Sequence, residues 1–116
     1  MRRDVEYLRD ILAAAEAVRE RLHGVSRAAF LRDGSLHDIV ARRLTIVGEA
    51  VARLTHETRR RAPDVDWAGV VAFRNVVVHG YFAIDWKIVW RVARRDLPTL
   101  RARIEVLLRE LETGPK

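Results

Sequence analysis

The amino-acid sequence predicts an all-α fold, an up-and-down bundle of four to five helices. Apolar residues recur at steps of three and four over long segments, which is the period of amphipathic helices. The chain has only six Gly and three Pro in 116 residues, and Gly24, Gly34, Pro63 and Gly80 stand between these segments. This length supports one core and is too short for two. We therefore expect a single domain over residues 1–112 and a frayed tail at 113–116.

The first predicted helix covers residues 5–22, with Arg and Glu on the face opposite its apolar stripe. The stripe consists of Val5, Leu8, Leu12, Ala15, Val18 and Leu22. His23-Gly24 ends it, because Gly adopts the left-handed conformation and a cationic His suits the terminal carbonyls. Residues 25–34 read as a connector with room for one helical turn around Phe30.

The second predicted helix begins at Ser35. Ser35 and Asp38 have the spacing of a capping box, in which each side chain binds a free amide of the first turn. An apolar seam follows, formed by Leu36, Val40, Leu44, Val47, Val51 and Leu54. The helix can run to about Arg61 before Pro63 closes it. We expect His37 and His56 to be solvated.

Residues 67–79 form a Val-rich segment that fits either a helix or a buried strand. The helix is preferred because the segment lacks strict alternation, follows Asp66 as a plausible N-cap and ends at Gly80. A lone strand would also have no partner strand, because the apolar residues of the other segments follow the helical period.

Asp85 caps the fourth predicted segment, whose apolar residues again alternate steps of four and three. They are Val89, Ala93, Leu97, Leu100, Ile104, Leu107 and Leu111. Pro98 is expected to kink or break this helix, because it has no amide donor and crowds the preceding turn.

Composition limits the classes of protein and of chemistry. The net charge is +6 and the isoelectric point is near 10.9, which favours a polyanionic partner. Twenty of the 22 cations are Arg, which binds phosphate through two nitrogens at once, but genome composition would give the same excess of Arg over Lys. The absence of Cys excludes disulfides and thiolate nucleophiles, and with no His pair at four-residue spacing we expect neither a metal site nor a cofactor. No apolar run approaches a membrane span or a signal sequence, so we expect a cytoplasmic protein without membrane contact.

The stretch from Arg74 to Tyr81 contains the candidate catalytic residues. On a helix, Arg74 and His79 lie about 140° apart around the axis and about 7.5 Å apart along it. Asn75 and His79 share a face, so the amide could orient the imidazole. The negative end of the helix favours the imidazolium form, which suits a general acid or base. The alternative to a catalytic role is that His79 is a partly buried structural residue with its hydrogen bonds satisfied, while the Arg74 side chain extends to water.

The segment F-R-N-V-V-V-H-G-Y-F-A-I-D resembles the signature of the HEPN superfamily in its HepT-like branch. The likeness extends over nearly the whole chain, through R-R-D-V-E-Y-L-R-D-I-L, R-R-L-T-I-V-G-E-A, P-D-V-D-W and W-R-V-A-R-R-D-L-P. Departures are mild: Ala72-Phe73 stands where relatives often carry Gly-Met, and Ala83 where Gly is frequent.

The resemblance implies a metal-independent endoribonuclease, the toxin of a type II/VII-like toxin–antitoxin module. In this family a helical bundle dimerises so that Arg and His of two protomers meet in one cleft that cleaves RNA. Carried over by position, Arg74 and His79 are the catalytic pair and Tyr81 is the motif's tyrosine, whereas the supporting role of Asn75 rests on its helical spacing to His79. The partner is a nucleotidyltransferase antitoxin that transfers AMP to the motif tyrosine, which makes Tyr81 the candidate modification site.

A homodimer is also expected from the apolar surplus of residues 67–79. Val70, Val71, Phe73, Val77 and Val78 give more apolar faces than one small bundle needs to bury. The alternative function is a non-catalytic helical protein that helps a minimal nucleotidyltransferase bind its substrate or nucleotide.

Overall fold

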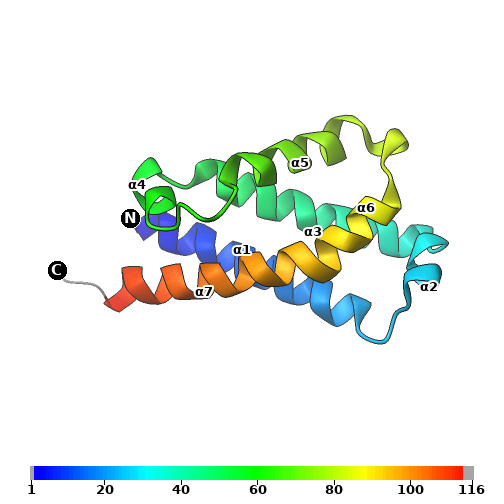
Figure 1. The fold of residues 1–116 in the computed structure, drawn as a ribbon, viewed down its shortest axis with the longest axis horizontal. Helices are drawn as coiled ribbons and strands as arrows, with labels where there is room; N and C mark the ends of the chain where they lie inside the picture. Colours follow the sequence, from blue (N-terminus) through cyan, green and yellow to red (C-terminus); the bar gives the residue numbers. More distant parts are fainter. Residues whose placement is uncertain (1, 114–116) are drawn as a thin grey trace.

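The computed structural model describes residues 2–113 and confirms the helical bundle (Figure 1). The long helices run antiparallel in an elongated body of 50 × 29 × 21 Å. In chain order they are α1 (Arg2–Leu22), α3 (Gly34–Arg53), α5 (Trp67–His79), and α6 (Trp86–Arg91) with α7 (Leu97–Thr113). Of the predicted tail, Thr113 ends α7 and the rest lies outside the described residues.

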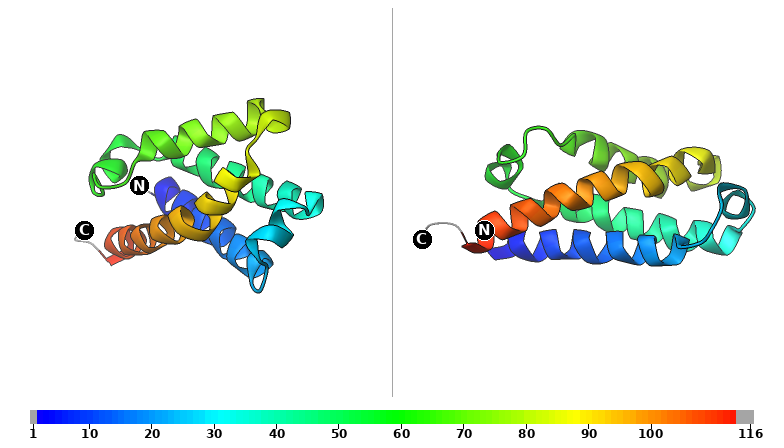
Figure 2. Two further views of the ribbon diagram at one scale, coloured as in Figure 1. Left: turned by 45° about the vertical axis from the view of Figure 1, so that its right-hand side comes forward. Right: turned by 60° about the horizontal axis from the view of Figure 1, so that its bottom comes forward.

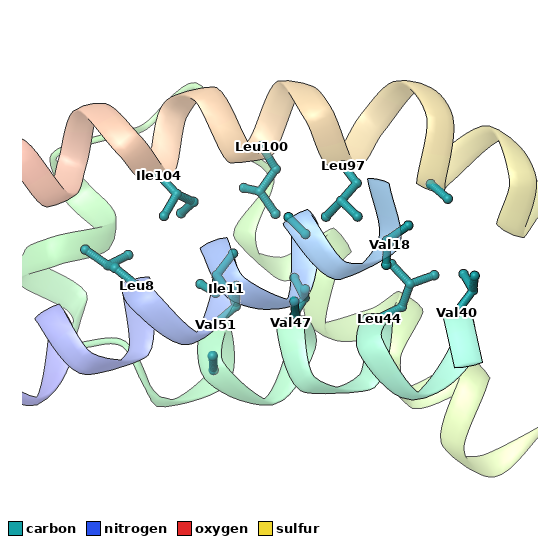
Figure 3. Packing of buried hydrophobic residues seen from close by; sticks show 14 of the residues in the cluster. Leu8, Ile11, Val18, Val40, Leu44, Val47, Val51, Leu97, Leu100 and Ile104 are labelled. Atoms are coloured by element: carbon teal, nitrogen blue, oxygen red, sulfur yellow. The ribbon is translucent and has the colours of Figure 1, made fainter. Parts of the chain in front are cut away.

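Helices α1, α3 and α7 surround the core, and α5 lies on the outer side of α3 (Figures 1 and 2). Buried aliphatic residues from the three predicted seams meet between them, as Figure 3 shows for Leu8, Val18, Leu44, Val47 and Leu100. The seams assigned from sequence are thus confirmed. Because α5 packs chiefly on α3, one side of α5 remains outside the bundle.

The end of α1 and the connector follow the sequence. Gly24 has φ +75°, the left-handed conformation expected just after the helix. The predicted turn is the short helix α2 (Arg27–Leu31), which buries Phe30 completely.

The start of α3 differs from the predicted capping box. Asp33, not Ser35, is the N-cap, and its carboxylate accepts a hydrogen bond from Leu36 N–H at 3.1 Å. His37 lies three and seven residues before Val40 and Leu44 and therefore shares their buried face of the helix. The expectation that His37 is solvated was therefore wrong: Nε2 donates to the Phe30 carbonyl at 2.7 Å. His56, in contrast, is exposed as expected.

The predicted run of α3 to Arg61 was also wrong, because the helix ends at Arg53 and a short helix, α4 (His56–Arg60), follows. The break is fixed by Asp4 of α1, whose buried carboxylate accepts hydrogen bonds from Thr55 N–H (3.2 Å), Thr55 Oγ1 (2.6 Å) and Thr58 Oγ1 (2.5 Å). Burial raises the pKa of Asp4, but these hydrogen bonds outweigh burial and lower the pKa below its ordinary value.

We expect Asp4 to make the stability of the fold depend on pH in the acidic range. Since its folded pKa is lowered, its contribution is complete above the ordinary pKa of 3.8 and is lost as the pH falls below that value. Asp4→Ala removes the acceptor of three hydrogen bonds from Thr55 and Thr58 and should cost about 1–3 kcal/mol near pH 7. Thermal unfolding from pH 2 to 7 measures both effects. Asp10→Ala, an exposed carboxylate on the same helix, is the control; equal acid sensitivity of the two variants would contradict the assignment.

Pro98 interrupts the last helix without breaking it. Between α6 and α7 lies a π-helical turn, η2 (Val92–Asp96), where Leu97 N–H bonds to the Val92 carbonyl five residues back. In an α-helix the proline ring would crowd the carbonyl of Arg94, and Arg94 lies inside this wider turn. Of the kink or break expected at Pro98, the break does not occur, and the helix instead changes pitch locally.

Candidate functional site

Helix α5 carries the predicted site to one end of the bundle. It spans Trp67–His79 as predicted from sequence, and Asp66 caps it by accepting a hydrogen bond from Gly69 N–H at 2.9 Å. Trp67 anchors the start, since its buried indole N–H donates to the carbonyls of Arg59 (3.0 Å) and Ala62 (3.1 Å). Arg74 and His79 therefore lie in the second half of a helix fixed at its beginning.

Arg74 sits where α5 comes closest to α3. A Cβ placed on Gly48 of α3 would overlap Arg74 Cβ and lie 2.6 Å from Arg74 Cγ, so only glycine fits opposite this side chain. The half-buried stem of Arg74 is thus held against the α3 backbone. Sequence reasoning missed this role of Gly48, although the residue lies inside the quoted segment R-R-L-T-I-V-G-E-A.

Asn75 has a different hydrogen-bond partner from the one expected. Arg74 Nε–H donates to Asn75 Oδ1 at 2.8 Å, so this amide orients the guanidinium. That bond occupies Nε and leaves the two terminal nitrogens of Arg74 to contact an anion. His79 is the last residue of α5 and is exposed, where its imidazole can exchange protons with a ligand.

Tyr81 lies just beyond α5 in the 3₁₀ turn η1 (Tyr81–Ala83). Its hydroxyl donates a hydrogen bond to Asp38 Oδ1 on α3, and its ring meets the edge of Trp86 at 5.7 Å between centroids. The hydrogen bond to the carboxylate, with some burial, raises the pKa of Tyr81. Asp38 was assigned to a helix cap from sequence, and its contact with Tyr81 joins residues 43 positions apart.

An open hollow of about 850 Å³ adjoins the Tyr81 side chain. It is bordered by the start of α3 and by Trp86, whose ring stacks on His37 at 4.1 Å between centroids. The group of aromatic rings packs on Phe30 and fixes the turn between α5 and α6. Asp85 caps α6 as predicted, accepting from Lys87 N–H at 3.0 Å.

Exposed apolar side chains surround the end of α5. Val76 and Val78 are 57% and 49% exposed, and Phe82 of η1 is fully exposed. Among the residues on which the sequence-based dimer was argued, Val78 is the exposed one: Val77 is buried, and Val70, Val71 and Phe73 are partly buried against the core of the same chain. The apolar surface is thus real but lies nearer to His79 than expected.

Within residues 2–113, no group of three His, Asp or Glu side chains could hold a metal ion. In the same range, no helix combines the length and the apolar character that crossing a membrane requires.

Comparison with known proteins gives consistent relatives across the chain. A protein provisionally named as an RNase in Methanocaldococcus jannaschii is 32% identical over 107 residues, covering 91% of this chain and 98% of the relative. A protein named as a probable ribonuclease HepT in Thermococcus cleftensis is 30% identical over 102 residues, covering 88% and 93%. A provisionally named RNase of Caldanaerobacter subterraneus subsp. tengcongensis is 32% identical over 104 residues, covering 90% and 93%. No solved structure matches significantly.

The family comparison agrees with the fold and with the sequence motif. The family described as "Ribonuclease HepT-like" matches residues 11–107, a range that includes α3, all of α5 and the turn with Tyr81. On this match and on the relatives above, the chain belongs to the HepT-like ribonuclease family.

Proposed function

We propose that this chain is a metal-independent endoribonuclease, the toxin of a type II/VII-like toxin–antitoxin module, acting on RNA in the cytoplasm. The observation that carries the proposal is the arrangement at the end of α5. Arg74 is seated against Gly48 and oriented by Asn75, and His79 stands exposed on the same helix. Family membership supplies the reaction class.

The chemistry follows from these two side chains. The 2′-hydroxyl of a ribose attacks its own 3′-phosphodiester, a new P–O2′ bond forms and the P–O5′ bond breaks. Arg74 binds the phosphate through its terminal nitrogens, where negative charge grows in the transition state. His79 moves the proton between the 2′-hydroxyl and the leaving 5′-oxygen. The products are a 2′,3′-cyclic phosphate and a free 5′-hydroxyl, and no step needs a metal ion.

The active cleft requires a second copy of the chain. Within one α5, Arg74 and His79 are five residues apart and point about 140° away from each other. A two-fold partner packed on the open side of α5 would cover Val76, Val78 and Phe82, and would bring Arg74 of one copy near His79 of the other. The exposed apolar residues support this arrangement, because burying them stabilises the pair.

Mixed dimers of two inactive variants test the shared cleft. Arg74→Ala and His79→Ala should each be inactive alone, whereas co-expression forms mixed dimers with one intact Arg–His pair. If the variants mix at random, roughly a quarter of wild-type cleavage should return, because half of the dimers are mixed and each has one working site of two. Cleavage of a fluorescent RNA in excess EDTA, with molar mass by light scattering, measures both the activity and the dimer.

Two results would contradict the proposal. A monomer at micromolar concentration, or no recovered activity in mixed dimers of confirmed composition, would remove the shared cleft. Wild-type protein that forms dimers and binds a nucleotidyltransferase but cleaves no RNA would favour the alternative function, a non-catalytic partner of that enzyme.

Control of the toxin is assigned to Tyr81. A nucleotidyltransferase antitoxin would join the α-phosphate of ATP to the phenol oxygen of Tyr81 and release pyrophosphate. The site supports this because Tyr81 lies two residues beyond His79 in a turn at the surface, beside an open hollow of about 850 Å³. Added phosphate would bring negative charge to the cleft and compete for Arg74.

A further inference from the structure

We propose that RNA leaves the active cleft along a row of cations on α6 and η2, which we name the basic strip. The strip consists of Lys87, Arg91, Arg94 and Arg95, with Arg27 of α2 facing them. All five side chains are exposed, and together they border a surface hollow of about 510 Å³. This inference rests on the proposed function and adds the path of the substrate.

Most of the strip has no neutralising partner. Within residues 2–113, Arg95 forms an ion pair with Asp96 at 3.3 Å, whereas Arg27, Lys87, Arg91 and Arg94 pair with no carboxylate. Asp85 also borders the hollow, but its Oδ1 accepts from the α6 backbone. Four unpaired cations on one surface repel each other, and an anionic ligand relieves that repulsion.

The spacing of the cations suits a chain of phosphates. Lys87, Arg91 and Arg94 follow at steps of four and three residues, so they lie near one face of the helix over roughly 10 Å. A single strand carries one phosphate per nucleotide, so successive cations of such a row can contact successive phosphates.

One cation of the strip is held in place before any ligand binds. The Arg94 guanidinium lies over the Trp90 ring at 5.2 Å from its centroid, and Trp90 in turn contacts the buried Phe30 at 5.3 Å between centroids. Fixing a long side chain in advance lowers the entropy lost when it binds phosphate.

Continuity with the cleft favours RNA over an acidic protein as the ligand. The strip starts one residue after Trp86, whose ring contacts Tyr81, and Tyr81 lies two residues beyond His79. Helices α5 and α6 are joined by the short turn η1, and α2 lies beside α6 at the same end of the bundle (Figures 1 and 2). A strand cleaved at His79 can therefore continue past Tyr81 and Trp86 to the strip.

Charge reversal with a matched control tests this path. In a His79→Ala background, which binds RNA without cutting it, we compare Arg91→Glu/Arg94→Glu with Arg60→Glu/Arg61→Glu. The control pair has the same charge change at exposed arginines of the α4 region, at the opposite end of the molecule (Figure 1). The probe is a short fluorescent oligouridylate, titrated at several salt concentrations, with thermal melts to confirm folding.

We expect the strip variant to bind at least about tenfold more weakly and the control to bind within about threefold of its parent. The slope of log affinity against log salt should fall by about 1.4 in the strip variant, since each phosphate contact with a single strand contributes roughly 0.7. Equal losses in both pairs would overturn the strip, because net charge alone would explain them. Unchanged binding in both would also overturn it and would point to a protein partner. Neither result bears on cleavage by the wild type, whose absence would instead overturn the proposed function.

Discussion

His79→Ala should lower RNA cleavage by about 10²–10⁴-fold, the usual contribution of a positioned proton-transfer group. The fold should be unaffected, because the imidazole is exposed at the end of α5, and exposed substitutions usually change stability by no more than about 0.5 kcal/mol. Initial rates on a fluorescent RNA and a thermal melt measure the two quantities. His56→Ala is the matched control, since His56 is an exposed histidine on α4 at the far end of the molecule.

Arg74 extends the same test. Arg74→Lys keeps the charge and most of the stem that packs against Gly48, but loses the planar pair of terminal nitrogens. Activity well below wild type in this variant indicates two-point binding of the phosphate, whereas full activity indicates a simple charge effect. Undiminished cleavage by a folded His79→Ala protein would contradict the assigned chemistry altogether.

Transfer of AMP to Tyr81 should abolish cleavage, and the loss should persist after the antitoxin is removed. The hydroxyl that now donates to Asp38 would become part of a phosphodiester, so the hydrogen bond is lost and two negative groups face each other. The turn η1 would then be pushed away from α3, next to His79. Intact-mass and peptide mass spectrometry should locate one or more AMP units on the Tyr81 peptide.

Variants of the two tyrosines separate covalent control from binding alone. Tyr81→Phe should escape neutralisation, whereas Tyr7→Phe, the control, should be neutralised like the wild type. If Tyr81 stays unmodified in the presence of a competent nucleotidyltransferase and ATP, while cleavage is still suppressed, control is exerted by binding alone.

The long helices could be predicted from sequence because their apolar periods are local and regular. Val40, Leu44, Val47 and Val51 lie on the buried face of α3 as the pattern requires. The break after Arg53 could not be predicted, because it depends on Asp4, which is about 50 residues away and reaches Thr55 only in the folded chain.

The candidate site shows the same division. The sequence places Arg74, His79 and Tyr81 correctly at the end of α5 and in the turn after it, because these positions depend on a local cap and a local helix end. It does not show that Asp38 accepts from Tyr81 or that Gly48 faces Arg74, since both contacts join α3 to a later segment. The sequence motif alone therefore does not reveal the contacts from α3 that hold Arg74 and Tyr81 in place.

At Gly48, the stability of α3 and the position of Arg74 place opposite demands on the residue. Alanine forms a helix better than glycine by about 1 kcal/mol, so α3 would be the stronger helix with alanine there. The same change would force apart the helix pair that seats Arg74. At Gly34 an added Cβ meets nothing within 4 Å, so alanine there carries no such conflict. An engineer seeking a more heat-resistant protein can therefore place alanine at Gly34, whereas alanine at Gly48 would strengthen α3 and displace Arg74.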